Sequence, residues 1–244
     1  MDFLINIFNI LLYQPLLNAL VLLYEYLPGR DFGIAVIILT VLTRVVFYPL
    51  GAQAIKSQKE LSELQPKIKE VQEKYKDDKQ KQSKALMELY QKEKINPLSG
   101  CLPLLIQLPI LIALYRVFWK GFEPEAIASL YSFVPNPGVV ETTFLGIVNL
   151  SQVNIPLAVV AGILQFFQTK MITSHSPKKT FKSKKGSLDF SQMMQKQMLY
   201  FFPIFTVIIL LKMPSAIAIY WIVTSLFSIF QQYLIFKKPA EKHA

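Results

Sequence analysis

The residues whose types could do chemistry lie within long apolar segments, and Arg44 is the clearest of them. It is thirteen residues after Asp31 and twelve before Lys56, so a helix would place it roughly 18 Å or more from either polar residue. Burying its charge in a bilayer costs about 2.5–3.5 kcal/mol or more. We therefore expect Arg44 to face a hydrated cavity, where it would attract acidic residues of a passing polypeptide. Snorkelling of its long stem to the membrane surface is the alternative.

Other polar side chains share these apolar segments, and together with Arg44 they could line an amphiphilic groove. Each alone is more often a hydrogen-bonding contact between helices than a site. Tyr220 and Trp221 are typical of packing or of anchoring at the membrane interface. The polar candidates are Thr40, Thr43, Gln107, Gln165, Gln168 and Thr224.

The composition argues against covalent catalysis and against a cofactor. The single cysteine, Cys101, excludes an internal disulfide, and His175 and His243 are too far from it in sequence to suggest a metal site. There is no catalytic triad and no phosphate-binding glycine loop. We expect neither an enzyme nor a bound metal.

The elements that must position these residues are membrane-spanning helices. Hydrophobic residues make up 52% of the 244 residues and are gathered in blocks. A helix that crosses the hydrocarbon core of a bilayer needs such a block of apolar residues. The chain is predicted to be an all-α integral membrane protein with a bundle of five transmembrane helices. Their expected positions are about 32–52, 97–119, 155–172, 198–211 and 215–236.

The N-terminal segment 1–28 is predicted to be an amphipathic helix that lies in the membrane interface. Residues 3–27 are apolar with interspersed polar residues, and Pro15 interrupts the middle. A spanning helix is the alternative. The N-terminus lacks the basic region of a signal peptide, so we expect the chain to be used whole. Residues 29–244 would form the core.

Residues 53–95 predict a helical hairpin outside the membrane. Apolar residues recur there at intervals of three and four, from Leu61 to Tyr75, as in a coiled-coil seam. The run 76–79 is typical of a turn, and Pro66 should kink the first arm or shift its start.

The basic residues predict the orientation. Eleven lysines lie in 53–96, seven in 170–196 and three in the tail, against Arg30, Lys120 and Lys212 on the other side. By the positive-inside rule the hairpin, the 173–196 loop and the C-terminus are cytoplasmic. The fourth span has only fourteen residues and would thin the bilayer locally, which lowers the cost of moving polar loops across.

Several motifs resemble the YidC/Oxa family of membrane protein insertases, and they cover nearly the whole chain. The run from Asn96 to Pro103, which contains Gly100 and Cys101, is the most specific. The matching stretches are Tyr13–Asn18, Asp31–Gly33, Leu42–Arg44, Tyr48–Leu50, Glu73–Asp78, Asn96–Pro103, Gln107–Ile110, Met213–Ser215, Tyr220–Trp221 and Gln231–Gln232.

The resemblance implies an insertase of the bacterial plasma membrane with a hydrophilic groove open to cytoplasm and lipid. Arg44 would be the groove arginine, and Gln165 or Gln168 would face the groove together with Trp221. The hairpin would make contacts through Lys74, Tyr75, Asp77 and Asp78. Implied partners are nascent membrane proteins, lipids, the Sec translocase, the signal recognition particle and the ribosome, with ribosomal RNA the only nucleic acid.

The sequence departs from the family pattern in two respects, and two other functions are alternatives to an insertase. The large periplasmic domain of some relatives and the lipid-anchored cysteine of others are absent, and the short tail puts tail-mediated ribosome docking in doubt. A small-molecule transporter would also explain an intramembrane charge, but no inverted repeat is visible. A non-catalytic assembly chaperone is the other alternative.

Overall fold

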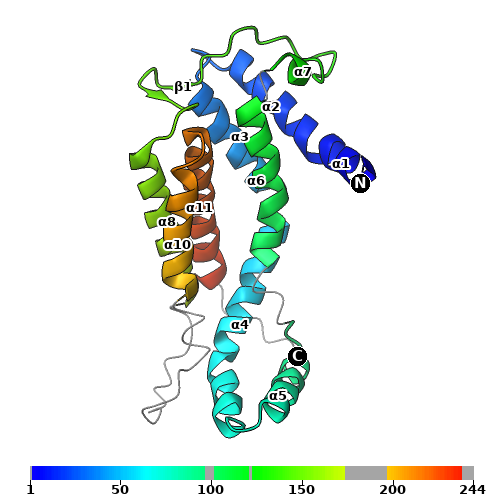
Figure 1. Cartoon of the computed structure of the whole chain (residues 1–244), viewed down its shortest axis with the longest axis vertical. Coiled ribbons are helices and arrows are strands. Elements are labelled where there is room, and N and C mark those ends of the chain that lie inside the picture. The colour runs from blue at the N-terminus through cyan, green and yellow to red at the C-terminus, as the bar shows by residue number, and fades with distance from the viewer. Residues whose placement is uncertain (1, 97–101, 121–122, 174–196, 238–244) are drawn as a thin grey trace. The chain divides into compact units, whose positions relative to one another are not determined.

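The computed structural model describes residues 2–96, 102–120, 123–173 and 197–237, which are mostly helical (Figure 1). They divide into two compact units, and the helices α8, α10 and α11 each contribute to both. The first unit comprises Met1–Phe47, Leu104–Gln165 and Ile204–Phe227. The second comprises Tyr48–Pro103, Phe166–Pro203 and Ser228–Ala244.

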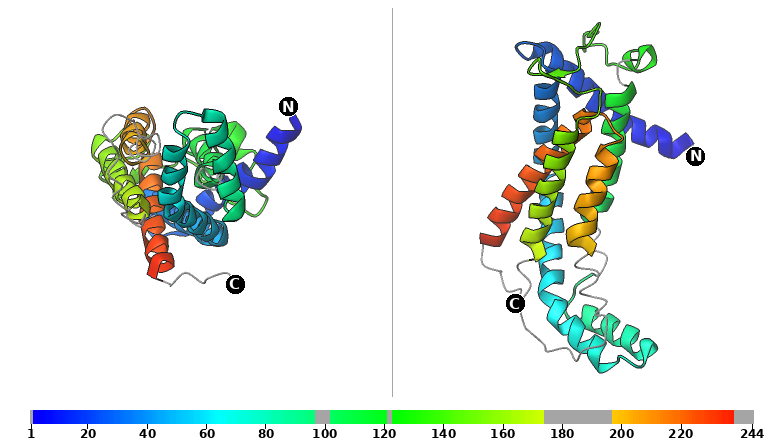
Figure 2. Two further views of the ribbon diagram at one scale, coloured as in Figure 1. Left: turned by 90° about the horizontal axis from the view of Figure 1, so that it is seen from below. Right: turned by 60° about the vertical axis from the view of Figure 1, so that its left-hand side comes forward.

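The first unit begins with a long helix that contains one π-helical turn. Its parts are α1 (Asp2–Phe8), the π-turn η1 (Asn9–Tyr13) and α2 (Gln14–Tyr26). The turn ends two residues before Pro15, whose missing N–H cannot continue the regular hydrogen-bond pattern, so the helix widens there instead of breaking. The N-terminal end of α1 projects away from the other helices of this unit (Figure 2).

The helix α3 (Phe32–Val46) is anchored at its start by Asp31. One carboxylate oxygen of Asp31 accepts a hydrogen bond from the Ile34 amide at 2.8 Å, and the other accepts one from the Leu145 amide. A side chain at Gly33 would come within 2.2 Å of the Phe144 ring. The glycine therefore allows the segment around residue 144 to lie directly on α3.

The segment 123–154 contains a short helix and a pair of strands. These are the helix α7 (Pro124–Ile127) and two antiparallel two-residue strands, β1 (Thr143–Phe144) and β2 (Val148–Asn149). Asn18 and Tyr24 of α2 hold this segment, because the Asn18 side chain accepts from the Tyr131 amide and the Tyr24 hydroxyl from the Glu141 amide. These contacts join residues more than one hundred positions apart, which local sequence patterns do not reveal.

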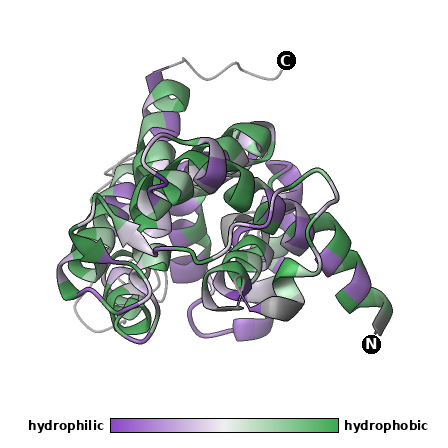
Figure 3. Ribbon diagram, turned by 90° about the horizontal axis from the view of Figure 1, so that it is seen from above, coloured by the Kyte–Doolittle hydropathy of each residue, from purple (hydrophilic) through white to green (hydrophobic). Residues whose placement is uncertain are grey.

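The core of the first unit is formed by α2, α3, α6 (Leu102–Lys120) and the adjoining parts of α8 (Ile155–Thr173), α10 (Phe202–Leu210) and α11 (Ser215–Lys237). Large apolar side chains remain exposed on the other helix faces, and apolar residues run along much of α1 (Figure 3). A bilayer would cover such faces. The fully buried core residues include Leu17, Leu20, Val36, Leu114 and Ile217.

Three helices among the described residues are long and apolar enough to cross a membrane, which makes this a multi-pass membrane protein. They are Phe3–Tyr26, Ile155–Thr173 and Ser215–Lys237, and a fourth candidate is a bent pair made of α3 and α4 (Tyr48–Lys74). The apolar helices Gln107–Trp119 and Leu199–Leu210 are shorter. The third and fifth predicted spans agree with α8 and α11 to within one residue at each end.

The fourth predicted span, 198–211, also begins with a π-turn. The turn η3 (Gln197–Phe201) leads into α10, and Pro203 follows it by two residues, as Pro15 follows η1. The predicted start of the second span at Pro97, together with Cys101, the basic loop from 174 and the tail from 238, lies outside the described residues.

The second unit contains two helices joined by a short turn, α4 and α5 (Lys79–Lys92). An ion pair of 2.6 Å between Lys67 and Glu93 joins them, and the Gln82 side chain donates to the Gln72 carbonyl at 2.9 Å. Leu64 and Ile68 of the predicted seam are buried. The expectation for Pro66 was wrong in one respect, because α4 continues through the proline and starts well before it.

Candidate functional site

Arg44 lies in the last turn of α3, not in the middle of a continuous span. The predicted helix 32–52 is interrupted at Phe47, and α4 starts at Tyr48. Pro49 explains the break, because it lacks a backbone donor and restricts the residue before it. The predicted uninterrupted span is therefore corrected, and the positive charge of Arg44 lies at the helix end that favours cations.

The guanidinium of Arg44 is held by a relay of neutral groups from two other helices. Its Nη2 donates to Oε1 of Gln107 on α6 at 2.7 Å, and Nε2 of Gln107 donates to the Tyr220 hydroxyl on α11. Tyr220 is only 1% exposed. The relay therefore links a charged side chain to a fully packed one and restricts where the charge can lie.

No carboxylate neutralises Arg44 within the part of the chain that the structure describes. The ion pairs there join other residues, and Arg44 itself is half-buried. A hydrogen bond to a neutral amide satisfies one donor of the guanidinium but leaves its net charge in place. Arg44 can therefore attract an anionic group from outside the fold.

The threonines next to Arg44 bond to their own helix. The Thr43 hydroxyl donates to the Thr40 carbonyl at 2.8 Å, and the Thr40 hydroxyl donates to the Val36 carbonyl at 2.6 Å. Thr40 is buried and Thr43 is half-buried. Hydroxyls bonded in this way tolerate an apolar surrounding, so these contacts do not by themselves make Thr43 a ligand-binding group.

Trp221 and Gln165 form a second polar contact in the same unit. The indole Nε1 of Trp221 donates to Oε1 of Gln165 at 2.8 Å. Both side chains are half-buried, and Trp221 directly follows Tyr220 on α11. Gln168 is half-buried too but belongs to the second unit. Of the two glutamines that the sequence left open, Gln165 is the one bonded to Trp221.

The predicted hairpin contacts lie at the turn between α4 and α5. Lys74 ends α4, and its ammonium lies 5.4 Å from the centre of the Tyr75 ring. Asp78 caps α5 by accepting from the Lys81 amide at 3.0 Å, and it pairs with the Lys81 ammonium at 3.1 Å. These bonds from Lys81 lower the pKa of the Asp78 carboxyl. Asp78 therefore has a structural role, whereas Asp77 is exposed in the turn.

Comparison with known proteins identifies the family. A sequence profile of the family described as 60Kd inner membrane protein matches residues 22–242. A relative from Fusobacterium nucleatum, named membrane protein insertase YidC, is 37% identical over 210 residues, which cover 86% of this chain and 88% of the relative. The chain belongs to the YidC/Oxa family.

Other YidC/Oxa relatives are considerably longer. Proteins of the same name from Geobacter metallireducens and Francisella tularensis subsp. novicida are 33% and 34% identical, over 96% and 87% of this chain. The chain spans only 38% and 34% of their respective lengths. The similarity thus covers almost all of this chain but a minor part of these relatives.

Three of the motifs that resemble the YidC/Oxa family contribute residues to the Arg44 relay. Leu42–Arg44 ends α3, Gln107–Ile110 lies within α6, and Tyr220–Trp221 lies within α11. The sequence predicted Arg44 and Gln107 as groove candidates, and Tyr220 as a packing residue or an anchor at the membrane interface. The Tyr220 hydroxyl, near the start of the apolar helix α11, was the signal that a polar partner was required.

Proposed function

We propose that this protein is an insertase that moves newly made membrane proteins into the bilayer and helps them fold. Its relatives in Fusobacterium, Geobacter and Francisella are named membrane protein insertases. The observation that carries the proposal is the half-buried Arg44, held by Gln107 without a neutralising carboxylate among the described residues. An immobilised positive charge in apolar surroundings suits transient binding of acidic residues in a polypeptide that is crossing.

The proposed route requires no covalent chemistry and no nucleotide. The hydrophobic helices of the client supply the driving force as they enter lipid, and Arg44 lowers the barrier for the polar segment that must cross. The client-facing residues would be Arg44 and Thr43 of α3, Gln107 of α6, and Trp221 of α11. Gln165 would orient Trp221 through the 2.8 Å hydrogen bond, and Gln168 would be a further client-facing residue.

The proposed topology has five transmembrane helices and an interfacial helix over residues 1–28. The distribution of lysines supports a cytoplasmic hairpin, a cytoplasmic 173–196 loop and a cytoplasmic C-terminus in a bacterial plasma membrane. The exposed lysines and the turn at 75–78 then make the hairpin the expected contact for the ribosome, the signal recognition particle and the Sec translocase. Lys74, Tyr75 and Asp77 would make those contacts, with Asp78 shaping the turn.

Reconstitution into liposomes that lack other translocases tests the activity. A single-spanning client with one acidic residue in its translocated segment is synthesised beside the liposomes, and insertion is measured as protection from added protease. We expect protection with the parent chain and at least about a tenfold loss of rate for Arg44→Ala, because an ion pair in a partly buried site supplies more than 1.4 kcal/mol. Arg44→Lys should keep part of the activity.

Two matched controls separate the charge from general damage. Arg30→Ala removes an exposed arginine outside the helices and should leave protection unchanged. A client whose acidic residue is replaced by its amide should insert with equal efficiency through the parent and the Arg44→Ala chain. Protection no greater than in empty liposomes would overturn the insertase assignment, and full activity of Arg44→Ala on the acidic client would remove Arg44 from the mechanism.

A further inference from the structure

The segment 123–154 of the first unit exposes apolar side chains that the proposed insertion route does not use. Leu145 and Ile147, in the turn between β1 and β2, are 59% and 83% exposed. Exposed apolar residues continue along the chain with Val153 and with Ile155, the first residue of α8. Apolar surface is unfavourable in water, and several such residues close together mark a site of contact.

The backbone of this turn makes a leucine at position 145 unexpected. The Ile147 amide donates to the Phe144 carbonyl at 3.0 Å, and the two residues between them, Leu145 and Gly146, have φ angles of 51° and 67°. Two-residue turns of this kind favour Asn, Asp and Gly, which tolerate a positive φ, whereas a leucine is strained there. A polar residue would suit a turn surrounded by water better, so the leucine indicates a contact outside the fold.

Contacts on the other side of the turn hold it in one orientation. The Leu145 amide donates to a carboxylate oxygen of Asp31, the residue that caps α3. The Phe144 ring occupies the space that a side chain at Gly33 would need. Phe144 therefore packs towards α3, while Leu145 and Ile147 are presented away from the fold by a fixed turn and not by a free loop.

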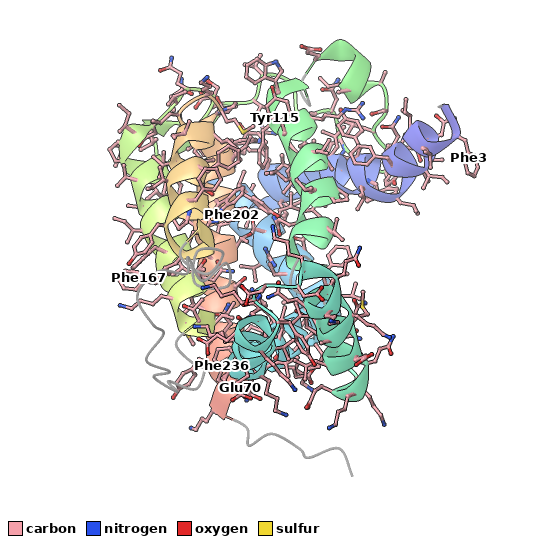
Figure 4. The ribbon with its side chains drawn as sticks, turned by 60° about the horizontal axis from the view of Figure 1, so that its bottom comes forward. Phe3, Glu70, Tyr115, Phe167, Phe202 and Phe236 are labelled. Atoms are coloured by element: carbon pink, nitrogen blue, oxygen red, sulfur yellow. The ribbon has the colours of Figure 1, made fainter. Side chains whose placement is uncertain are left out.

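Both ends of the segment lie where helices leave the apolar part of a bilayer. Figure 1 shows the segment crossing the ends of the helices of this unit, and β2 ends six positions before α8, a helix long and apolar enough to cross a membrane. At the other end, Tyr115 and Trp119 of α6 have ring centres 5.6 Å apart, and Figure 4 shows Tyr115 near this end of α6. Such aromatic residues are typical of the headgroup region.

The charges of the segment favour the apolar part of the membrane surface over anionic headgroups. No lysine or arginine occurs from residue 121 to residue 169, and three glutamates are the only charged residues of this stretch. A surface without basic residues gains no attraction from anionic lipids. The attraction to a bilayer must therefore come from the exposed apolar side chains.

We propose that the turn between β1 and β2 is an anchor in the membrane surface. Leu145 and Ile147 insert into the boundary between headgroups and acyl chains of the leaflet at this end of the helices, and lipid is what covers them. The hydrogen bond from the Leu145 amide to Asp31 ties the anchor to α3, the helix that carries Arg44 at its other end. This inference does not depend on the proposed insertase activity.

Depth-dependent fluorescence quenching in lipid nanodiscs tests the proposal. Ile147→Cys is made in a Cys101→Ser background, so that it carries the only thiol of the chain, and is labelled with the fluorophore NBD. The full chain is placed, one copy per nanodisc, in phosphatidylcholine that includes a lipid with a doxyl quencher near the headgroup end of one acyl chain. Burial of such side chains favours the inserted state by more than about tenfold, so we expect the doxyl lipid to remove most of the emission.

Iodide in the surrounding solution gives the complementary measurement. It should quench the label far less than it quenches the soluble NBD adduct of free cysteine. A label as accessible to iodide as that adduct would overturn the proposal. A label shielded from iodide but not quenched by the doxyl lipid would also overturn it, because the chain itself would then cover the turn.

A matched pair of variants at Leu145 separates the anchor from a structural role. Leu145→Asn removes an apolar side chain but tolerates the positive φ, so the labelled chain should lose much of its doxyl quenching without a lower unfolding temperature in detergent micelles. Leu145→Met stays apolar and should keep the quenching. Quenching that is unchanged in Leu145→Asn would refute the role of this residue, and the unfolding measurement shows that each variant is folded.

The lipid composition distinguishes apolar insertion from electrostatic attraction. Replacing half of the phosphatidylcholine by phosphatidylglycerol should leave the quenching unchanged, because the segment has no basic residue to attract the added charge. Quenching that appears only with phosphatidylglycerol would show that charge brings the turn to the membrane, and would overturn the assignment to an apolar anchor.

Discussion

Two arginines in apolar helices of the same unit are held in different ways. Arg44 donates to Gln107, which is backed by the fully buried Tyr220, and it lies at a helix break. Arg116 donates to Asn9 and stacks against the rings of Tyr13 and Phe8 beside a cavity. Both use a neutral amide as the acceptor, and neither belongs to an ion pair among the described residues.

The comparison shows that neighbouring groups can hold an arginine side chain in an apolar helix in two different ways. A relay from two other helices holds Arg44 in place, which suits the proposed role of this charge in binding acidic residues of clients. Arg116 is held by one hydrogen bond to Asn9 and by contacts with the rings of Tyr13 and Phe8, which orient a guanidinium less strictly than hydrogen bonds do. The following changes test whether the hydrogen bonds of Gln107 and the contact of Arg116 with the Tyr13 ring stabilise the fold by different amounts.

The largest effect is expected when the Gln107 amide is removed from the relay. Gln107→Leu removes the amide that accepts a hydrogen bond from Arg44 and donates one to Tyr220, so the chain should lose about 1.5–3 kcal/mol of stability. Gln107→Glu is the matched variant, because it retains an acceptor but places a negative charge beside Arg44. It should keep the stability and lose the insertion of acidic clients.

Thermal unfolding in detergent micelles and the protease-protection assay measure these two properties separately. If Gln107→Leu unfolds at the temperature of the parent chain, the relay does not support the fold. If Gln107→Glu inserts acidic clients normally, the net charge at Arg44 is not what they require.

A smaller effect is expected when the ring under Arg116 is removed. Tyr13→Leu keeps the apolar volume but loses the ring, so stability should fall by about 0.5–2 kcal/mol. Tyr13→Phe keeps the ring and should cost less. The same unfolding measurement checks both variants, and equal losses for Leu and Phe would show that the hydroxyl, and not the ring, supports Arg116.

The smallest effect is expected at a charge outside the apolar helices. Hydrogen bonds from Lys81 lower the pKa of Asp78 below its ordinary value of 3.8, so the ionised cap stabilises the turn above that pH. The stabilisation is lost as the pH falls through the lowered pKa. Carboxyl ¹³C NMR of Asp78 should show a midpoint below 3.8, and Lys81→Ala should raise it. A midpoint at or above 3.8 would contradict the cap seen at α5.

Much of the helical layout follows from local patterns. The apolar blocks predicted α8 and α11 closely, because a segment of that length and composition has few other structures available in lipid. The spacing of Leu64 and Ile68 predicted the buried seam of α4. The cytoplasmic side assigned to the hairpin stays a prediction, as do the five-span topology and the flat placement of residues 1–28.

The errors arose where one residue acts on the backbone of its neighbours. Pro49 ends α3 at Val46, although the apolar pattern continues. Pro15 and Pro203 each follow a π-turn, where a helix with a simple interruption was expected for Pro15. In each case the missing N–H of proline decided the local geometry of the helix.

The sequence by itself determined that this chain belongs in a membrane, where most of its helices lie, and that Arg44 is a charge inside an apolar segment. The tertiary structure alone decided that the partner is Gln107, sixty-three residues away, with Tyr220 behind it. It also brought Asn9, Tyr13 and Arg116 around one cavity. Hydrophobicity and helix signals act over a few turns of chain and can be read locally, whereas hydrogen bonds between distant helices depend on packing that no local pattern records.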